Sequence, residues 1–397
     1  MSTSPTAPCS ASTQMTQGLI TLFAFCCGAI VANIYYAQPI IELIAPEVGL
    51  SAHGASLIVS LTQIGYALGL LFLVPLADLV ENRRLMLATA ALSTLALLAF
   101  GLSSSAPVLL AMALLIGFSS VSVQMLIPLA AHLAPEQTRG RVVGSIMGGL
   151  ILGILLARPA SSLIADHFGW RAVFVTAAGL MVVIITVMSR TMPRRVPDHR
   201  ATYGELLASL YHLMARYAVL RQRSLYQALM FAAFSLFWTA APLELARVHG
   251  LSQSQIAIFA LVGAIGAVAA PVAGRLADAG HTQKASLLAL LLAPVAFWVA
   301  AVHPAYSVIG LAVTGVLLDF AVQMNMVLGQ RAIYALDAAS RGRLNALYMT
   351  SIFIGGAIGS SVASSLYEQG GWGAVMVCGS ALPLLALGCL LFNSRRR

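Results

Sequence analysis

The segment "VPLAD" at residues 74–78 returns as "GRLAD" at residues 274–278. Three further matches follow in the same order: "VQM" at 123–125 and 322–324, "RGR" at 139–141 and 341–343, and "GWRAV" at 169–173 against "GWGAV" at 371–375. The four pairs are separated by 199 to 202 residues. Self-similarity at one spacing and in one order indicates an internal repeat. The chain therefore consists of two halves built on the same plan.

The composition is that of an integral membrane protein. Only 9% of the 397 residues are charged, 59% are hydrophobic and the mean hydropathy is +0.90, whereas soluble domains carry about 25% charged residues. Most apolar runs reach the roughly 20 residues that a helix needs to cross a bilayer, and none alternates like a barrel strand. We predict an all-α membrane protein with twelve transmembrane helices in two pseudo-symmetric six-helix halves. The predicted spans are 18–44, 52–75, 85–103, 107–133, 142–165, 171–190, 224–248, 253–274, 285–303, 306–334, 344–367 and 372–392.

The same pattern divides the chain into five parts. Residues 1–17 are rich in Ser and Thr and lack the basic start of a secretory signal, so we expect a disordered cytoplasmic tail. The other parts are an N-terminal six-helix half (18–190), a cytoplasmic linker (191–223), a C-terminal six-helix half (224–392) and a basic cytoplasmic tail (393–397). Two halves with the same direction in the membrane are typical of transporters, in which a pathway lies between the halves.

Basic residues set the predicted orientation. The chain has 22 Lys and Arg against 13 Asp and Glu, a net charge of +9. With the N-terminus inside, the arginines between or beside the spans fall in cytoplasmic loops, except Arg171 and Arg247, as the positive-inside rule requires. We predict a bacterial inner-membrane protein with both termini in the cytoplasm. We attribute the net positive charge to the orientation of the chain in the membrane and to attraction by anionic lipid head groups. Nucleic acid is not an expected partner.

No pattern typical of an enzyme is present. The chain has no P-loop and no HExxH, and its five cysteines lack the spacing of a zinc site. We therefore expect no enzyme activity, no cofactor and no metal. The expected partners are a small-molecule substrate, protons and the lipid bilayer, and the expected state is a monomer.

Arg158 lies inside the fifth span, in "GILLARPASS" at 153–162. At the 202-residue offset its counterpart is Ser360, so the repeated scaffold does not require the charge. Counting about 1.5 Å per residue from Val142 places Arg158 about 24 Å into a core about 30 Å thick. Such a residue either faces a cavity or a partner, or extends its side chain to the periplasmic head groups. In the first case it binds an anionic substrate group or pairs with a titrating carboxylate.

Asp319 is the unmatched charge of the second half, in "VLLDFAVQMN" at 316–325. Its counterpart at the 199-residue offset is Ser120, again uncharged. A carboxylate at mid-membrane depth gains or loses its proton according to which side has access, as proton coupling requires. The alternative is a permanently paired structural carboxylate, with Arg158 or Arg331 as its partner.

Glycines recur at four-residue spacing on the fifth and eleventh spans. Small residues let helix backbones approach closely in lipid. We interpret them either as surfaces on which the two halves slide or as static packing. The pairs are Gly144 with Gly148, Gly149 with Gly153, and Gly355 with Gly359.

Four segments carry a resemblance to a known family. They are "NIYYAQP" (33–39), "RGRVVGS" (139–145), "VLGQRAIYAL" (327–336) and "RLNALYMTSIFIGGAIGS" (343–360). Together they resemble the major facilitator superfamily over nearly the whole chain. Within it, the chain is similar to the twelve-span bacterial exporters of the drug:proton antiporter kind, in a branch with "NIYYAQP" in the first helix.

The resemblance includes a loop signature after the second span of each half. In the first copy the glycine is replaced by Val74, whereas Asp78 is kept; in the second, Gly274 and Asp278 are both kept. The resemblance implies that each aspartate meets the start of a helix in the other half and latches the outward-facing state. The implied gating residues are Asp78, Arg83, Arg84, Asp278, Arg139, Arg141, Arg341 and Arg343.

In the superfamily, the first, fourth, seventh and tenth helices line the cavity. The residues thereby implied to contact substrate are Asn33, Tyr36, Gln124, Gln227, Phe231, Phe234, Trp238, Gln323 and Met326. Gln323 and Met326 follow Asp319 at steps of 4 and 3 residues, which places the three on one helical face. Amides, a phenol, aromatics and a thioether suit a small amphipathic compound better than a phosphorylated one.

The function predicted from these observations is secondary active transport across the inner membrane. The chain would export a small amphipathic organic molecule, such as a drug, sugar or metabolite, by proton antiport through alternating access. Asp319 and Arg158 are the predicted proton-coupling residues. The alternatives are a proton symporter or facilitator for uptake and, in a different class, a non-transporting membrane receptor.

Overall fold

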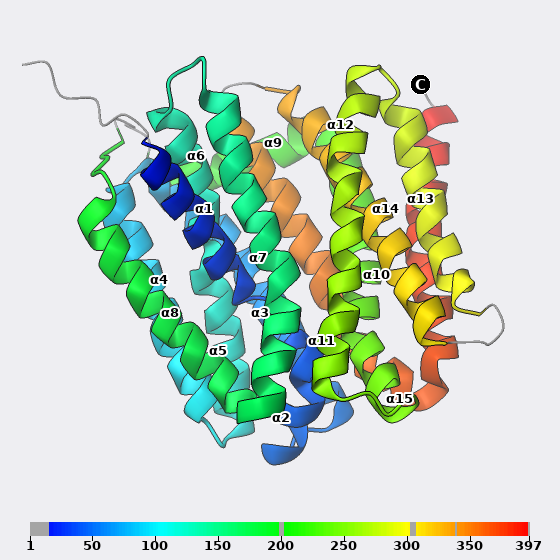
Figure 1. The fold of residues 1–397 in the computed structure, drawn as a ribbon. Coiled ribbons are helices and arrows are strands. Elements are labelled where there is room, and N and C mark those ends of the chain that lie inside the picture. Colours follow the sequence, from blue (N-terminus) through cyan, green and yellow to red (C-terminus); the bar gives the residue numbers. More distant parts are fainter. Residues whose placement is uncertain (1–15, 198–201, 302–306, 338–339, 396–397) are drawn as a thin grey trace, which may run out of the picture.

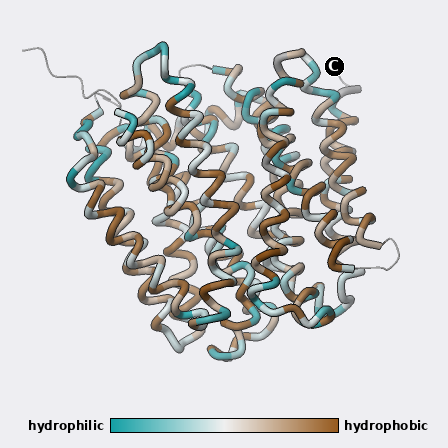
Figure 2. Tube along the Cα trace, viewed as in Figure 1, coloured by the Kyte–Doolittle hydropathy of each residue, from teal (hydrophilic) through white to brown (hydrophobic). Residues whose placement is uncertain are grey.

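The structure, a computed structural model, describes residues 16–197, 202–301, 307–337 and 340–395. Every regular element within these ranges is a helix (Figure 1). Hydrophobic residues dominate the middle of the helices, and hydrophilic residues gather at the two ends of the bundle (Figure 2). This distribution is the one that a bilayer imposes on spanning helices. The predicted tail at 1–17 falls almost wholly outside the described residues.

The N-terminal half is made of eight α-helices and three short 3-10 helices. They are α1 (Gln17–Ala32), η1 (Gln38–Ile40), α2 (Ile41–Glu47), α3 (Ala52–Phe72), η2 (Val74–Asp78), α4 (Asn82–Leu102), α5 (Ala106–Ser119), η3 (Ser120–Ser122), α6 (Val123–Leu133), α7 (Arg139–Phe168) and α8 (Trp170–Thr191).

The linker and the C-terminal half follow. The linker contains α9 (Tyr203–Arg216), which begins with a capping box between Thr202 and Glu205. The half itself comprises α10 (Ala218–Arg247), α11 (Gln253–Val262), η4 (Gly263–Val268), α12 (Ala269–Asp278), α13 (Thr282–Val299), α14 (Val308–Tyr334) and α15 (Arg341–Arg395).

The described residues account for the twelve predicted crossings. Ten segments are long and apolar enough to span a membrane, and the last of them, Arg341–Asn393, contains two predicted spans. Gly371 divides that segment, because its φ of +57° interrupts the helix. The first crossing is α1 with its continuation through η1 and α2. The predicted all-α fold is therefore confirmed.

Three predicted spans are interrupted by non-α segments. The first span stops at Ala32 and turns through 33–37, the fourth changes to 3-10 geometry at 120–122, and the eighth does so at 263–268. In the fourth span, the hydroxyl of Ser120 donates to the carbonyl of Ile116, which competes with the regular helical ladder. Broken helices of this kind mark binding sites in transporters.

The two ends of the bundle differ in how the halves meet. We call them the α2 end, which carries α2 and the α7–α8 turn, and the α9 end, which carries α9 and the α12–α13 turn (Figure 1). Between halves, α3 packs against α15 and α7 packs against α11. Near the α9 end, in contrast, α6 packs on α1, α7, η2 and η3, while α12 packs on α13, α14 and η4, each within its own half. Figure 1 shows α7 and α12 apart at the α9 end, and α7 and α11 converging at the α2 end.

The glycine pairs resolve one of the alternatives above. A Cβ at Gly28 of α1 would lie 2.5 Å from the carbonyl oxygen of Gly149, and one at Gly153 would meet Gly28. Likewise, Cβ atoms at Gly355 and Gly359 would meet the backbone of α10. All of these contacts lie within one half. The interpretation as sliding surfaces between halves is therefore wrong for Gly149, Gly153, Gly355 and Gly359, which provide static packing. A Cβ at Gly144 or Gly148 would meet no atom within 4 Å, so that pair makes neither kind of contact in this conformation.

Candidate functional site

The break in the first helix brings polar side chains to the contact between halves. Asn33 turns into the N-terminal half, where its Nδ2 donates to Ser93 Oγ (3.4 Å) and contacts Met181 Sδ (3.5 Å). Gln38 at the start of η1 is buried and contacts the other half, because its Nε2 donates to Thr239 Oγ1 of α10 (3.2 Å). The predicted substrate residue Asn33 is thus engaged inside its own half, whereas Gln38 was not predicted.

Arg158 is buried on α7, with only 4% of its surface exposed. Its Nε donates to Gln38 Oε1 (2.8 Å). The guanidinium carbon lies 5.1, 5.3 and 4.7 Å from the ring centroids of Tyr35, Phe234 and Trp238. Phe234 and Trp238 belong to α10, so this cation–π contact joins the two halves. Among the described residues, no hydrogen-bond partner is found for the buried Nη2.

Asp319 on α14 contacts the same tryptophan at the edge of its ring. Trp238 Nε1 donates to Asp319 Oδ1 at 2.8 Å. The 3-10 segment η4 packs on the carboxylate, and its glycines make this possible: a Cβ at Gly263 would lie 2.6 Å from Asp319 Oδ2, and one at Gly266 would lie 2.5 Å from Asp319 Cβ. The break in the eighth span therefore accommodates the predicted coupling residue.

Trp238 stands between the two predicted coupling residues. Its ring face receives the Arg158 cation and its N–H binds the Asp319 carboxylate. Of the ion pairs formed within the described ranges, none joins Arg158 directly to Asp319. The indole thus connects a cation of one half to an anion of the other, at a depth where unpaired charges are costly.

A ladder of polar contacts holds α3 to the C-terminal half. Ser56 Oγ donates to Ser364 Oγ (2.8 Å), Ser60 Oγ and Ser360 Oγ lie 3.0 Å apart, and Gln63 Nε2 donates to Ser235 Oγ (2.9 Å). Since α3 begins at the α2 end with Ala52, these contacts occupy the half of the bundle nearest that end.

Ionic contacts add to the closure of the α2 end. Arg247 binds Glu42 with both Nε (2.8 Å) and Nη2 (2.6 Å), which joins the halves at the surface. Ser254 also donates to Asp166 across the halves. Arg171 binds Glu47 within the N-terminal half and thereby holds the pKa of that carboxyl below its ordinary value.

The other predicted substrate residues fall into two groups. Gln227 is fully buried between α10 and α14, where its amide binds Asn325 and the carbonyl of Val322. Gln124 donates to Tyr66 within the N-terminal half. Tyr36, Phe234, Gln323 and Met326 keep part of their surface exposed, and Phe231 stacks on Phe234 with ring centroids 5.0 Å apart.

The predicted gating residues do not form a latch between halves in this conformation. Asp78 is exposed, and no hydrogen bond or ion pair within the described residues reaches it. Asp278 ends α12, but its side chain lies outside the described residues. The remaining contacts are local: Arg83 with the carbonyl of Ser189, Arg84 with Glu81, Arg341 with the carbonyl of Tyr334, and Arg343 with Ser340, while Arg139 and Arg141 are exposed. The latch stays a prediction for a conformation closed at the α9 end.

Several residues at the contact between halves are not among those predicted from the sequence. Tyr35 and Gln38 lie within the segment "NIYYAQP" but were not selected from it. Ser56, Ser60 and Gln63 follow steps of 4 and 3 residues in an apolar span, and this polar stripe was a usable signal.

Comparisons with known proteins agree with this fold. A Major Facilitator Superfamily profile matches residues 20–278 and 223–397. The putative uncharacterized transporter YgaY of Escherichia coli K12 is 40% identical over 378 residues, which cover 94% of this chain and 95% of the relative. The probable transporter SCO4007 of Streptomyces coelicolor is 33% identical over 93% of this chain and 85% of its own length.

Solved structures share the architecture at low sequence identity. A bacterial homolog to the human lysosomal transporter Spinster, in an inward-facing and occupied conformation, matches with a TM-score of 0.76 at 15% identity, covering 95% of this chain and 96% of its own. The nucleoside transporter NupG matches with a TM-score of 0.73 at 11% identity, covering 94% and 99%. These likenesses concern the fold alone.

Proposed function

Because the chain belongs to the Major Facilitator Superfamily of membrane transporters, we propose that it exports a small amphipathic organic molecule across the bacterial inner membrane in exchange for protons. In this proposal the α9 end faces the cytoplasm, as the distribution of basic residues predicts. The conformation described above is then open to the cytoplasm.

The observation that carries the proposal is the contact of Arg158 and Asp319 with Trp238. Arg158 belongs to the N-terminal half, whereas Trp238 and Asp319 belong to the C-terminal half. Alternating access requires the halves to separate at the α2 end. Arg158 must then leave Trp238, so the conformational change alters the charge environment of Asp319.

This change supplies a route for coupling to protons. When the α2 end opens, Asp319 loses its nearby cation, and a buried carboxylate without a cation is costly to keep ionised. Asp319 then takes up a proton from the periplasm. When the α9 end opens, Arg158 returns to Trp238 and Asp319 releases the proton to the cytoplasm. Protons therefore move inward, which is the direction that drives export of a substrate loaded from the cytoplasm.

The predicted substrate residues that remain partly exposed support an amphipathic substrate. Phe234 and Met326 present apolar surface, and Tyr36 and Gln323 present a phenol and an amide, all partly exposed. Sites for small organic ligands combine apolar walls with a few polar groups in this way.

One observation favours a second candidate function, proton symport. The buried Nη2 of Arg158 has no partner among the described residues, and an anionic substrate group would satisfy it. Such a group would neutralise Arg158 and thereby favour a proton on Asp319. An anionic substrate and a proton would then travel in the same direction.

Proton movement in proteoliposomes distinguishes these functions. An interior pH dye reports proton flux while gradients of amines, sugars and carboxylates are imposed one at a time. The wild type is compared with Asp319→Asn and with a control, Glu136→Gln, which removes an exposed carboxylate in the α6–α7 loop.

Proton flux opposite to the compound, lost in Asp319→Asn and kept in Glu136→Gln, is the expected result. Flux in the same direction as the compound establishes symport instead. Movement of a compound without proton flux, equal in the wild type and Asp319→Asn, contradicts the coupling role and identifies a facilitator. Specific binding without movement of any compound indicates a receptor.

A further inference from the structure

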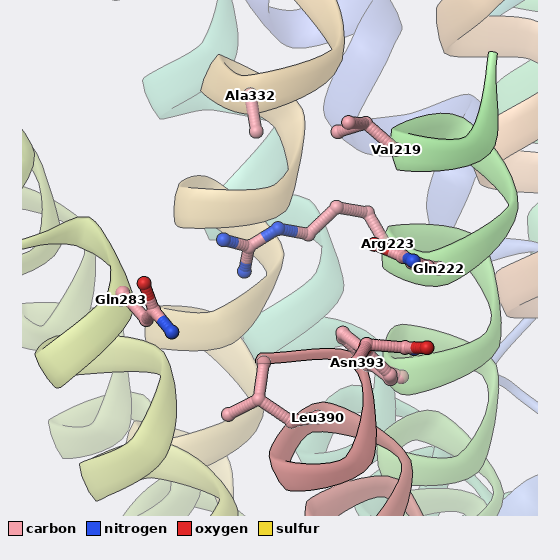
Figure 3. Close-up of a pocket in the computed structure, with 8 residues that line it drawn as sticks. Val219, Gln222, Arg223, Gln283, Ala332, Leu390 and Asn393 are labelled. Atoms are coloured by element: carbon pink, nitrogen blue, oxygen red, sulfur yellow. The ribbon is translucent and has the colours of Figure 1, made fainter. Parts of the chain in front are cut away.

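Two adjoining hollows lie at the α9 end of the C-terminal half, away from the contact between halves. The first, of about 180 Å³, is lined by Val219, Gln222, Arg223, Tyr226, Gln283, Ala332, Leu390 and Asn393 (Figure 3). The second, of about 490 Å³, is lined by Gly280, His281, Gln283, Lys284, Leu287, Leu390 and Leu391. Gln283 and Leu390 line both, so the two hollows form one groove beside α13 and the end of α15.

The first hollow has a fixed polar wall around a cation. Figure 3 shows the Arg223 guanidinium extending from α10 toward Gln283, and its Nη1 donates to Ser286 Oγ of α13 (2.6 Å). Asn393 Nδ2 donates to Tyr226 OH (2.9 Å), which joins the end of α15 to α10 one turn from Arg223. A planar guanidinium with five donors matches phosphate oxygens in geometry as well as in charge.

The second hollow adds a second cation and an apolar surface. Lys284 and His281 start α13, while Leu287, Leu390 and Leu391 line the rest. Leu391 is 47% exposed, so this side opens outward from the bundle. Of the described residues that line the groove, Arg223 and Lys284 are permanently charged and none is a carboxylate.

We propose that this groove binds the phosphate head group of an anionic phospholipid, with an acyl chain along the leucines. The lining residues fall within the first three turns of α10, at the start of α13 and in the last two turns of α14 and α15, so the groove reaches from the depth of lipid head groups into the apolar layer. Basic pockets between helices on the cytoplasmic side are typical sites for such head groups. Among phosphate compounds, the apolar half of the groove favours a lipid over a soluble phosphate. The groove would be the same in either orientation of the protein in the membrane. The proposed orientation determines only which leaflet supplies the lipid.

The site would connect the lipid to the transport helix. Arg223 lies on α10, the helix that also carries Phe234 and Trp238. A head group bound between α10 and α13 would restrain the start of α10, and anionic lipid would therefore regulate the movement of the candidate site.

The test is native mass spectrometry of the full chain in detergent, titrated with phosphatidylglycerol or with phosphatidylcholine. Separate arms use inorganic phosphate and glycerol 3-phosphate. The variants are Arg223→Gln, Lys284→Gln and the double substitution. The control is Arg216→Gln, which removes an exposed cation at the same end, outside the groove.

The wild type should prefer phosphatidylglycerol, and affinity should fall about fivefold for each single substitution and about thirtyfold for the double, since each basic side chain contributes about 1 kcal/mol. Arg216→Gln should bind like the wild type. Equal affinity for both lipids, or an equal loss in the control, overturns the proposal. Binding of the soluble phosphates as tight as that of phosphatidylglycerol assigns the site to free phosphate instead.

A second measurement covers variants that do not fold. A photoactivatable phosphatidylglycerol is crosslinked to the wild type in membranes, and the modified peptides are mapped. Adducts within 219–226, 280–291 or 390–393 support the site. Adducts confined to residues outside these segments overturn it.

Discussion

Arg158→Gln should release the α2 end of the bundle. The substitution removes the guanidinium that lies 5.3 Å from the Phe234 ring centroid and 4.7 Å from that of Trp238. It retains an amide that can still bind Gln38. The main effect of the substitution is therefore to break the cation–π interaction between the two halves.

The expected magnitude follows from that interaction. A desolvated cation–π interaction contributes about 2 kcal/mol. Because the two rings share a single cation, we take about 2 kcal/mol for both rings together rather than a sum. This free energy changes the ratio of the α9-open to the α2-open state by about thirtyfold in favour of the α2-open state.

Distances between spin labels across the α2 end measure this ratio. Labels at Phe168→Cys of α7 and Val248→Cys after α10 report on opposite halves, and both native side chains are exposed (79% and 64%). The five native cysteines are replaced beforehand. In Arg158→Gln, the distance distribution should move from the short to the long population.

Arg171→Gln is the matched control for this experiment. It removes an arginine at the same end, but Arg171 contacts Glu47 and Trp170 within the N-terminal half. Its distribution should therefore equal that of the wild type. An unchanged distribution in Arg158→Gln, or an equal change in Arg171→Gln, would show that the Arg158 cation–π contact does not hold the α2 end closed.

Two further substitutions test neighbouring contacts. Gly263→Ala should abolish proton coupling, because its Cβ would lie 2.6 Å from Asp319 Oδ2 and displace the carboxylate. The control is Gly18→Ala, whose Cβ meets no atom within 4 Å and which should keep wild-type proton flux in the proteoliposome assay. Normal flux in Gly263→Ala would contradict this prediction. Glu42→Gln should open the α2 end only slightly, by about fivefold or less, because the partly exposed pair with Arg247 contributes about 1 kcal/mol at most. In the wild type, high salt should screen this ion pair and slightly increase the population of long spin-label distances. Glu42→Gln should not show this response to salt.

The order of the helices could be predicted from sequence because it depends on local properties. The repeated segments, such as "RGR" at 139–141 and 341–343, revealed the two halves, and the apolar runs revealed the crossings. The breaks at 33–37 and 263–268 were not predicted. Hydropathy reports how apolar the side chains of a segment are, but not whether its backbone keeps the regular helical hydrogen bonds. A broken span and a continuous span therefore have the same hydropathy pattern.

Part of the candidate site was also accessible from sequence. Arg158 and Asp319 were identified because the repeat places uncharged Ser360 and Ser120 at the equivalent positions. Gln227, in contrast, has the residue type of a substrate contact but is fully buried between α10 and α14. Side-chain type and spacing do not show which face of a helix packs against other helices of its own half and which face lies at the contact between halves.

The two-fold helical plan, and the two charges for which the repeat has no counterpart, can thus be read from the amino-acid sequence. That both charges contact Trp238, which lies 80 residues beyond Arg158 along the chain and 81 before Asp319, follows from the packing of the helices. The difference has a physical cause. Partition of a segment into the bilayer depends on that segment alone, whereas a contact among α7, α10 and α14 depends on how two whole halves pack and on which end of the bundle is closed.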